Sequence, residues 1–122
     1  MNRIAVVEDN PDNRLLLHAM LDGAYEITDY ETGTDALAGL SHGLADLVLL
    51  DISLPGMDGL EVLRRLRDMA ATKHLPVIAL TAHAMAGDRE RFLAAGFDGY
   101  LTKPIVSDAE LIDAIRRQLE RN

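Results

Sequence analysis

The sequence contains no cysteine, and aromatic residues make up only 4% of its 122 residues. Without cysteine there is no disulfide framework and no thiol catalyst, and nothing indicates an oxidising compartment. No apolar run approaches the roughly 20 residues that a membrane-spanning helix needs. The N-terminus also lacks the basic-then-apolar layout of a signal peptide. These absences predict a soluble, cytoplasmic chain that does not enter a membrane.

Basic residues are scarce as well. The chain has 12 Lys and Arg against 20 Asp and Glu, which gives a formal net charge of −8 at pH 7. Nucleic acid and anionic membranes are recognised by clustered Lys and Arg, so we expect no direct binding to either. The sequence shows no linker, repeat or low-complexity tract. A chain of this length can bury about two-thirds of its unfolded surface without metal or disulfide staples. We therefore expect one domain over residues 1–122.

Short apolar or β-branched runs alternate with helical patterns along the whole chain. Five such runs, bounded by turn residues, are predicted to be strands: residues 3–8, 25–30, 46–50, 76–80 and 99–101. Capping signals between and after them mark helix ends: Asn10 with Pro11, Asp58 with Glu61, Ser107 with Glu110, and Gly96 as a stop. The chain thus reads as five strand–helix units.

This alternation predicts a doubly wound α/β fold with a five-stranded parallel sheet. Parallel neighbours need crossover connections, and helices are the usual ones. The first, third and fourth runs are almost continuously hydrophobic, as expected for strands that helices cover on both faces. In such a fold the functional site lies beyond the carboxyl ends of the strands, at the point where the strand order reverses.

Polar side chains of reactive type follow four of the predicted strands. They are Glu8 and Asp9 at the end of the first strand, Asp51 at the end of the third, Thr81 at the end of the fourth and Lys103 after the fifth. An acidic residue after a strand is often only a turn former or a helix cap. Placement at four strand ends of one sheet is much harder to attribute to loop chemistry, so these residues are the candidate site.

The chemistry of this set indicates phosphoryl transfer. Carboxylates 4 Å apart repel by about 4 kcal/mol per pair at an effective dielectric near 20, so either raised pKa values or a hard cation must offset the repulsion. Mg²⁺ fits best, because it takes one or two protein carboxylates and leaves positions for waters and phosphate oxygens. Lys103 and Thr81 would supply a charge and a hydroxyl to an anion. Such a set around Asp51 suits phosphoryl transfer to an aspartate.

Four segments carry a resemblance to a known family: VVEDN, LVLLDISLPGMDGLEVL, PVIALTA and GYLTKP. Over essentially its whole length the sequence resembles the receiver domains of two-component response regulators, the CheY-like family. Thr81 and Lys103 follow Asp51 by 30 and 52 residues, separations typical of that family. Within it, the chain is similar to stand-alone regulators of the DivK type and to receivers of hybrid kinases. The resemblance implies a flavodoxin-like (βα)5 fold with strand order 2-1-3-4-5.

The resemblance also implies roles for the site residues. Asp51 is expected to accept a phosphoryl group from a phosphohistidine on a histidine kinase or phosphotransfer protein, with Thr81 and Lys103 holding the phosphoryl oxygens. The bond between Lys103 and Pro104 is expected to be cis, which only X-Pro bonds adopt at low cost. The implied Mg²⁺ positions are Asp9, Asp51, the backbone carbonyl of Ser53 and, through water, Glu8.

Further residues are implied to transmit and time the signal. Tyr100 matches the family's aromatic switch position, although a half-buried strand tyrosine is the plainer reading. With Thr81 it is expected to switch a surface of the fourth helix, fifth strand and fifth helix that a downstream effector recognises. Ser53 and His83 are expected to tune self-dephosphorylation. No enzymatic activity is implied beyond the protein's own phosphorylation and dephosphorylation, and a monomer or weak homodimer is expected.

Three other classes of protein share part of this pattern. A phosphohydrolase of the haloacid dehalogenase type also uses a strand-end aspartate, but it needs a second Asp two residues later, where this sequence has Ser53. A degenerate receiver that only binds proteins remains an alternative, although no site residue is missing. Nucleotide binding on a Rossmann-like sheet is excluded because no G-x-G-x-x-G follows the first strand.

Overall fold

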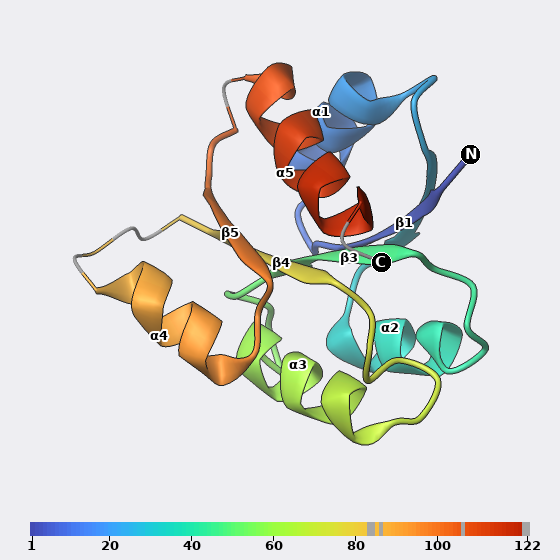
Figure 1. Cartoon of the computed structure of the whole chain (residues 1–122), viewed down its shortest axis with the longest axis vertical. Coiled ribbons are helices and arrows are strands. Elements are labelled where there is room, and N and C mark those ends of the chain that lie inside the picture. The colour runs from blue at the N-terminus through green and yellow to red at the C-terminus, as the bar shows by residue number, and fades with distance from the viewer. Residues whose placement is uncertain (83–84, 86, 106, 121–122) are drawn as a thin grey trace.

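The computed structural model describes residues 1–82, 85, 87–105 and 107–120, in which strands and helices alternate (Figure 1). The strands are β1 (Arg3–Val7), β2 (Glu26–Tyr30), β3 (Leu47–Asp51), β4 (Val77–Thr81) and β5 (Gly99–Thr102). The helices are α1 (Pro11–Leu21), α2 (Gly33–Leu40), α3 (Gly59–Asp68), α4 (Asp88–Ala95) and α5 (Asp108–Glu120). Each predicted strand is present, and most boundaries differ from the prediction by one residue.

The strands form one parallel sheet in the order β2-β1-β3-β4-β5. This confirms the doubly wound, flavodoxin-like fold and its strand order. The register places Val7 beside Leu50 and Asp51 beside Leu80. The carboxyl ends of β1, β3 and β4 therefore meet at one edge of the sheet, next to the point where the order reverses between β1 and β3.

Two hydrophobic clusters, one on each face of the sheet, form the core. Helices α1 and α5 cover one face and α2, α3 and α4 cover the other (Figure 1). Strand β3 serves both clusters, because Leu47 and Leu49 point to the first face while Val48 and Leu50 point to the second. Successive side chains of a strand point to opposite faces of the sheet, so a strand that is buried on both faces has to be apolar at every position. This explains the unbroken apolar run of β3.

The predicted helix caps are present. The Asn10 side chain accepts hydrogen bonds from two backbone N–H groups at the start of α1, and Gly96 ends α4 in the left-handed region, at φ 116°. Asp58 accepts from the backbone N–H of Glu61, 3.0 Å away. The Glu61 carboxylate does not reach back as in a full capping box. It bonds instead to Arg64 and Arg65, and these bonds lower its pKa.

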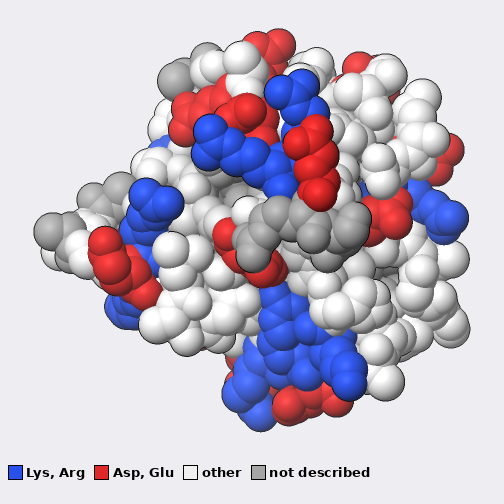
Figure 2. Space-filling view, in the orientation of Figure 1, with Lys and Arg blue, Asp and Glu red and all other residues white. Residues whose placement is uncertain are grey.

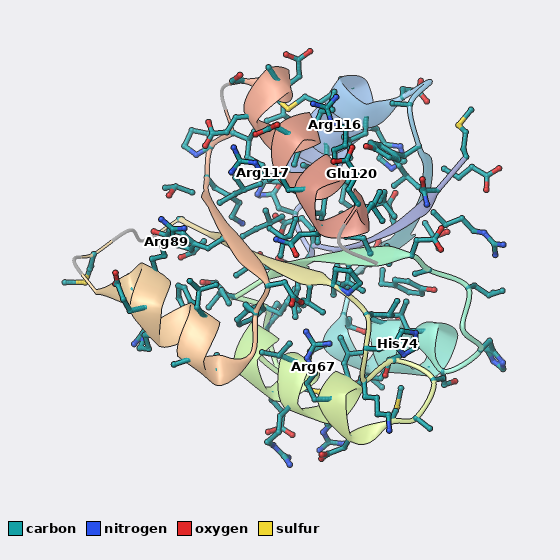
Figure 3. All side chains as sticks on the ribbon, viewed as in Figure 1. Arg67, His74, Arg89, Arg116, Arg117 and Glu120 are labelled. Carbon is teal, nitrogen blue, oxygen red and sulfur yellow. The ribbon has the colours of Figure 1, made fainter. Side chains whose placement is uncertain are left out.

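At the edge opposite the candidate site, Arg67 ties several elements together (Figure 3). From the last turn of α3 its guanidinium donates to the backbone carbonyls of Leu75, Lys73 and Gly96 and to the carboxylate of Asp98, at 2.9 Å. The same Asp98 oxygen accepts the backbone N–H of Val77. This network joins the ends of α3 and α4 to the starts of β4 and β5.

Helix α5 is amphipathic. Arg116, Arg117 and Glu120 are on the exposed side of α5 (Figure 3), while Leu111 and Ile115 on its other side are buried in the core. Among the described helices, none has the length and apolar character needed to cross a membrane.

Candidate functional site

The predicted carboxylates lie together at the carboxyl edge of the sheet. Glu8 and Asp9 directly follow β1, and Asp51 is the last residue of β3. One carboxylate oxygen from each lies within 4.8 Å of the others. Glu8 and Asp51 are buried, with 0% and 2% of their surface exposed, whereas Asp9 is exposed. The site therefore has two negative charges inside the fold and a third at its mouth.

The loop after β3 positions Asp51. Its Oδ1 accepts the backbone N–H of Ser53 at 3.0 Å, and the loop closes when the N–H of Gly59 donates to the carbonyl of Ile52 at 3.0 Å. A Cβ at Gly59 would lie 2.6 Å from the carbonyl oxygen of Asp51, which is too close for any other residue. The glycine thus lets α3 begin directly against the end of β3.

Lys103 brings a positive charge into the cluster from the loop after β5. Its Nζ lies 2.9 Å from Oε1 of Glu8 and 3.2 Å from Oδ2 of Asp51. Its backbone N–H donates to the carbonyl of Thr81 at 2.7 Å, which fixes the loop beside the end of β4. The bond between Lys103 and Pro104 is cis, as predicted.

Burial and neighbouring charges shift the pKa values of two groups in the cluster, Glu8 and Lys103. The pKa of Glu8 is raised, mainly because burial removes its carboxylate from water and because Asp51 adds a hydrogen bond and like charge; Lys103 opposes this shift. Burial by itself lowers the pKa of Lys103, but the hydrogen bond to Glu8 and the negative charges of Asp51 and Glu8 outweigh burial and leave it raised. The lysine is therefore held as an ammonium ion.

Helix α1 supplies polar contacts that sequence reasoning did not identify. The Asn13 side chain donates to Oε1 of Glu8 at 3.1 Å, and Arg14 donates to the backbone carbonyl of Glu8 at 2.8 Å. The backbone N–H of Asn10 also donates to Glu8, at 3.4 Å. Asn10 precedes the helix as its cap, and Asn13 and Arg14 lie in its first turn, so no periodic pattern in the sequence marked these residues as contacts of Glu8.

The remaining predicted residues lie around the cluster at different depths. Thr81 is buried at the end of β4. Ser53 is partly buried in the loop after Asp51. Tyr100 is half-buried on β5, with its ring 5.7 Å from that of Phe92 on α4. His83 lies outside the described residues.

The donor set fits a hard divalent cation. Carboxylate oxygens are the ligands that Mg²⁺ prefers, and it is commonly bound by one or two of them together with waters and phosphate oxygens. Glu8, Asp9 and Asp51 are the residues that could hold such an ion. The Lys103 ammonium beside them supplies a fixed charge for an anion. Cation and anion would therefore meet at Asp51.

A parallel sheet of order 2-1-3-4-5 with an acidic cluster and a lysine at its switch point defines the receiver class of signalling domains. Residues 4–116 match the family model described as the response regulator receiver domain. The chain belongs to this family, and is thus a receiver domain of two-component signalling.

Several relatives are similar over nearly the whole chain. The polar-differentiation response regulator DivK of Brucella ovis is 39% identical over 117 residues, which cover 95% of this chain and 94% of that protein. The sensor protein GacS of Pseudomonas syringae pv. syringae is 40% identical over 117 residues, 93% of this chain. The chain spans only 13% of the length of GacS and 25% of the response regulator PleD of Caulobacter vibrioides.

Solved structures show the same architecture. The receiver domain of a sensor histidine kinase from Pseudomonas aeruginosa is 38% identical, covers 98% of both chains and superposes with a TM-score of 0.88. That crystal structure has a magnesium ion coordinated in its active-site cleft. Chemotaxis protein CheY4 of Vibrio cholerae, 26% identical, has a TM-score of 0.88 as well.

Proposed function

We propose that the protein accepts a phosphoryl group on Asp51 from a phosphohistidine of a histidine kinase or phosphotransfer protein, in a two-component phosphorelay. The observation that carries this proposal is the setting of the Asp51 carboxylate. One oxygen is held by the N–H of Ser53 at 3.0 Å, and the other lies 3.2 Å from the Lys103 ammonium. An oriented, buried carboxylate beside a fixed positive charge suits a nucleophile that attacks a phosphorus atom.

The proposed cofactor is Mg²⁺, held by Asp9, Asp51 and the backbone carbonyl of Ser53, with Glu8 acting through water. The cluster of oxygens within 4.8 Å supports this assignment, as does the magnesium in the cleft of the similar Pseudomonas aeruginosa domain. When bound, such an ion offsets the charge of the carboxylates and of the transferring phosphoryl group. The protein's own residues then orient the reacting groups.

In the proposed transfer, a carboxylate oxygen of Asp51 forms a bond to phosphorus while the bond from phosphorus to the donor's imidazole nitrogen breaks. The imidazole keeps the electron pair and takes up a proton. Lys103 moves from its carboxylate partners to a phosphoryl oxygen, and the hydroxyl of Thr81 holds another. Beyond this reaction and the hydrolysis of its product we propose no enzymatic activity.

The signal would leave the site through Thr81 and Tyr100. The phosphoryl group adds about −1.5 to −2 charges and three acceptor oxygens, which would draw the Thr81 side chain toward Asp51. Tyr100 could then turn into the space behind it and reshape the surface formed by α4, β5 and α5, where a downstream effector would bind. Allosteric couplings of this kind amount to about 1–3 kcal/mol, so phosphorylation would shift a ratio of two states.

We propose that Ser53 and His83 tune the lifetime of the aspartyl phosphate. Exchanging either for a residue of different size or polarity should change the hydrolysis rate more than the stability. Equal decay of the phosphorylated wild type and both variants would argue against this role.

The acceptor role is tested with Asp51→Asn. Incubated with Mg²⁺ and a small phosphodonor such as phosphoramidate, the wild type should gain one acid-labile phosphoryl group by mass spectrometry, and the variant should gain none. Asp58→Asn is the matched control, because it removes a carboxylate from the same loop while Asn still caps α3. Labelling that persists in Asp51→Asn would remove Asp51 from this role.

The switch is tested with Thr81→Ala and Tyr100→Ala. Both variants should still bind beryllofluoride at Asp51. In NMR spectra, the amide shifts that beryllofluoride induces over α4, β5 and α5 of the wild type should largely disappear in the variants. Full shifts in Tyr100→Ala would mean that the signal leaves by another face.

A further inference from the structure

Three donors that the structure describes hold the Glu8 carboxylate, and two of them share one oxygen. Oε1 accepts a hydrogen bond from the Lys103 ammonium at 2.9 Å and another from the side-chain amide of Asn13 on α1 at 3.1 Å. Oε2 accepts the backbone N–H of Asn10 at 3.4 Å. Since 0% of the surface of Glu8 is exposed, these donors take the place that water has around an exposed carboxylate.

Charges at the surface are held differently. On the face shown in Figure 2, acidic and basic side chains lie next to one another and are open to water. Arg117 and Asp113 on α5, for example, are 3.1 Å apart, with 75% and 46% of their side chains exposed. Water can replace either partner of such a pair, so its loss changes stability little. Loss of a donor to a buried charge is costly, and Glu8 therefore depends on its few protein donors.

The space beside Glu8 leaves little room for water. A cavity of about 10 Å³ between α1 and the loop after β5 is lined by Glu8, Asn13 and Lys103. Its other lining residues have apolar side chains: Leu16, Leu17, Leu80, Pro104 and Ile105. A cavity needs about 10–15 Å³ to hold one water molecule. The cavity thus accepts one water at most, and its apolar wall offers Glu8 no further side-chain donor.

The proposed phosphoryl transfer takes one of these donors away. When Lys103 moves to a phosphoryl oxygen, Oε1 of Glu8 keeps only the amide of Asn13 among its described side-chain donors. We propose that Asn13 is a positioning residue that holds the Glu8 carboxylate in place while Lys103 leaves it, a role that rests on the proposed acceptor function of Asp51. Such a contact stabilises the phosphorylated state more than the resting state, in which Lys103 also holds Glu8.

Asn13→Leu tests the proposal, because leucine fills the space beside Glu8 and has no donor. Leucine is also the better helix former, so the fold should be retained, which urea unfolding checks. In NMR titrations at saturating Mg²⁺, the beryllofluoride concentration that half-saturates Asp51 should rise about tenfold, the loss expected for one hydrogen bond to a buried charge. The Kd of Mg²⁺ alone should change by less than about threefold, since Lys103 then has no anion to move to and still holds Glu8.

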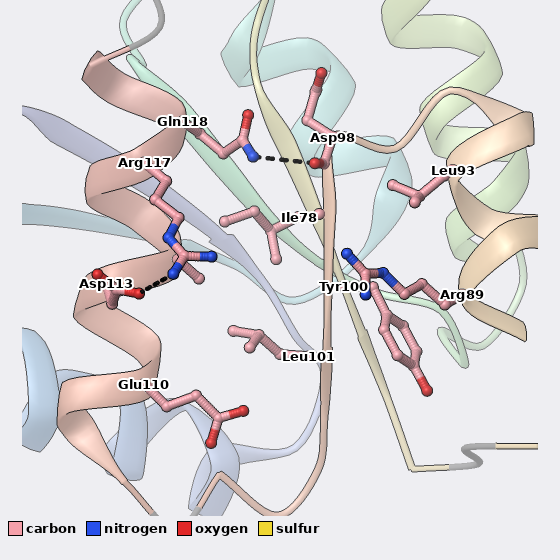
Figure 4. A pocket seen from close by; sticks show the side chains of 12 residues that line it. Ile78, Arg89, Leu93, Asp98, Tyr100, Leu101, Glu110, Asp113, Arg117 and Gln118 are labelled. Atoms are coloured by element: carbon pink, nitrogen blue, oxygen red, sulfur yellow. Dashed lines mark hydrogen bonds and ion pairs between the residues drawn. The ribbon is translucent and has the colours of Figure 1, made fainter.

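Gln118→Leu is the matched control. It also replaces an amide by leucine, and it removes a hydrogen bond of 3.0 Å to the backbone carbonyl of Asp98 at the opposite edge of the sheet (Figure 4). This variant should bind beryllofluoride like the wild type. A double-mutant cycle gives a second readout: in Glu8→Gln, which has no buried charge to hold, Asn13→Leu should lower the affinity for beryllofluoride by less than about twofold.

Three results would overturn the proposal. The first is an Asn13→Leu variant that binds beryllofluoride like the wild type. The second is an equal loss of affinity for Mg²⁺ and for beryllofluoride, because a contact that only supports the fold weakens both alike. The third is an undiminished loss in the Glu8→Gln background. A wild type that neither binds beryllofluoride nor is labelled at Asp51 would instead refute the acceptor role, and this role of Asn13 with it.

Discussion

Replacing Asp9 with Asn should stabilise the fold in the absence of divalent cations and should remove its stabilisation by Mg²⁺. Asp9 lies at the mouth of the carboxylate cluster, where its oxygen is within 4.8 Å of oxygens of Glu8 and Asp51. Its side chain is exposed, so the change removes charge without leaving a cavity. One substitution thereby probes both the repulsion within the cluster and the proposed metal site.

The magnitude follows from these distances. Two unit charges 4.8 Å apart repel by about 3.5 kcal/mol at an effective dielectric of 20 and by about 0.9 kcal/mol in bulk water. Asp9 faces two carboxylates, but the Lys103 ammonium lies against both of these and offsets part of their negative charge. Because Asp9 is exposed, a gain of about 1–2 kcal/mol is expected. For a chain of this size each kcal/mol corresponds to about 3–6 °C in Tm.

The assay is urea unfolding followed by circular dichroism at pH 8, in EDTA and in excess MgCl₂. Asp22→Asn is the control, because it removes the same charge from an exposed position at the end of α1, outside the cluster. In EDTA, Asp9→Asn should exceed both the wild type and Asp22→Asn in stability. In MgCl₂ the wild type and the control should gain stability, while Asp9→Asn should gain little. A variant no more stable than the control in EDTA would refute the repulsion argument, and an undiminished gain from Mg²⁺ would refute ligation by Asp9.

The other stability predictions concern three different contacts. The pKa of Glu8 is raised above 4.5, so the stability that its neutral form contributes is present below that pH and is lost as the pH rises through the folded-state pKa. In EDTA, Glu8→Gln should therefore gain stability relative to the wild type between pH 4 and pH 8. A difference in stability that stays constant over this range would contradict the argument. Arg67→Ala should cost about 2–4 kcal/mol in urea unfolding, since Asp98 and the backbone carbonyls lose their donor, with Arg67→Lys recovering only part. Asp58→Ala should cost about 1 kcal/mol by removing the α3 cap, whereas Asp58→Asn should change little.

Local sequence patterns were sufficient for the strands and for those helix ends that carry a capping signal. The run LVLLD predicts a strand covered on both faces, and β3 alternates between the two core clusters as that pattern requires. Asn10, Asp58 and Gly96 cap helices where their side-chain chemistry predicts. These features depend on neighbours within a few residues, so a single sequence contains the information. The strand order does not follow from such patterns, and it was predicted only through the resemblance to receivers.

Contacts between distant segments could not be predicted in the same way. The fold class predicts that the polar residues gather at one edge of the sheet. It does not predict which of them contact one another. Lys103 contacts Glu8 across 95 residues, and Arg67 contacts Asp98 across 31. The support that Asn13 gives Glu8 depends on how α1 is rotated over the sheet. Such geometry is set by side-chain packing in the core, which sequence periodicity does not encode.

The distribution of charge along the chain explains why the site depends on tertiary structure. From residue 15 to residue 63 there are nine Asp and Glu and no Lys or Arg, so Asp51 has no cation near it in sequence. Only folding brings Lys103 within 3.2 Å of it. The attraction of the lysine offsets part of the repulsion between Asp51 and Glu8, and burial of β1, β3 and β4 in the two core clusters has to supply the rest. The site is thus held in place by the hydrophobic core and retains unbalanced negative charge, which is the condition that favours a bound divalent cation.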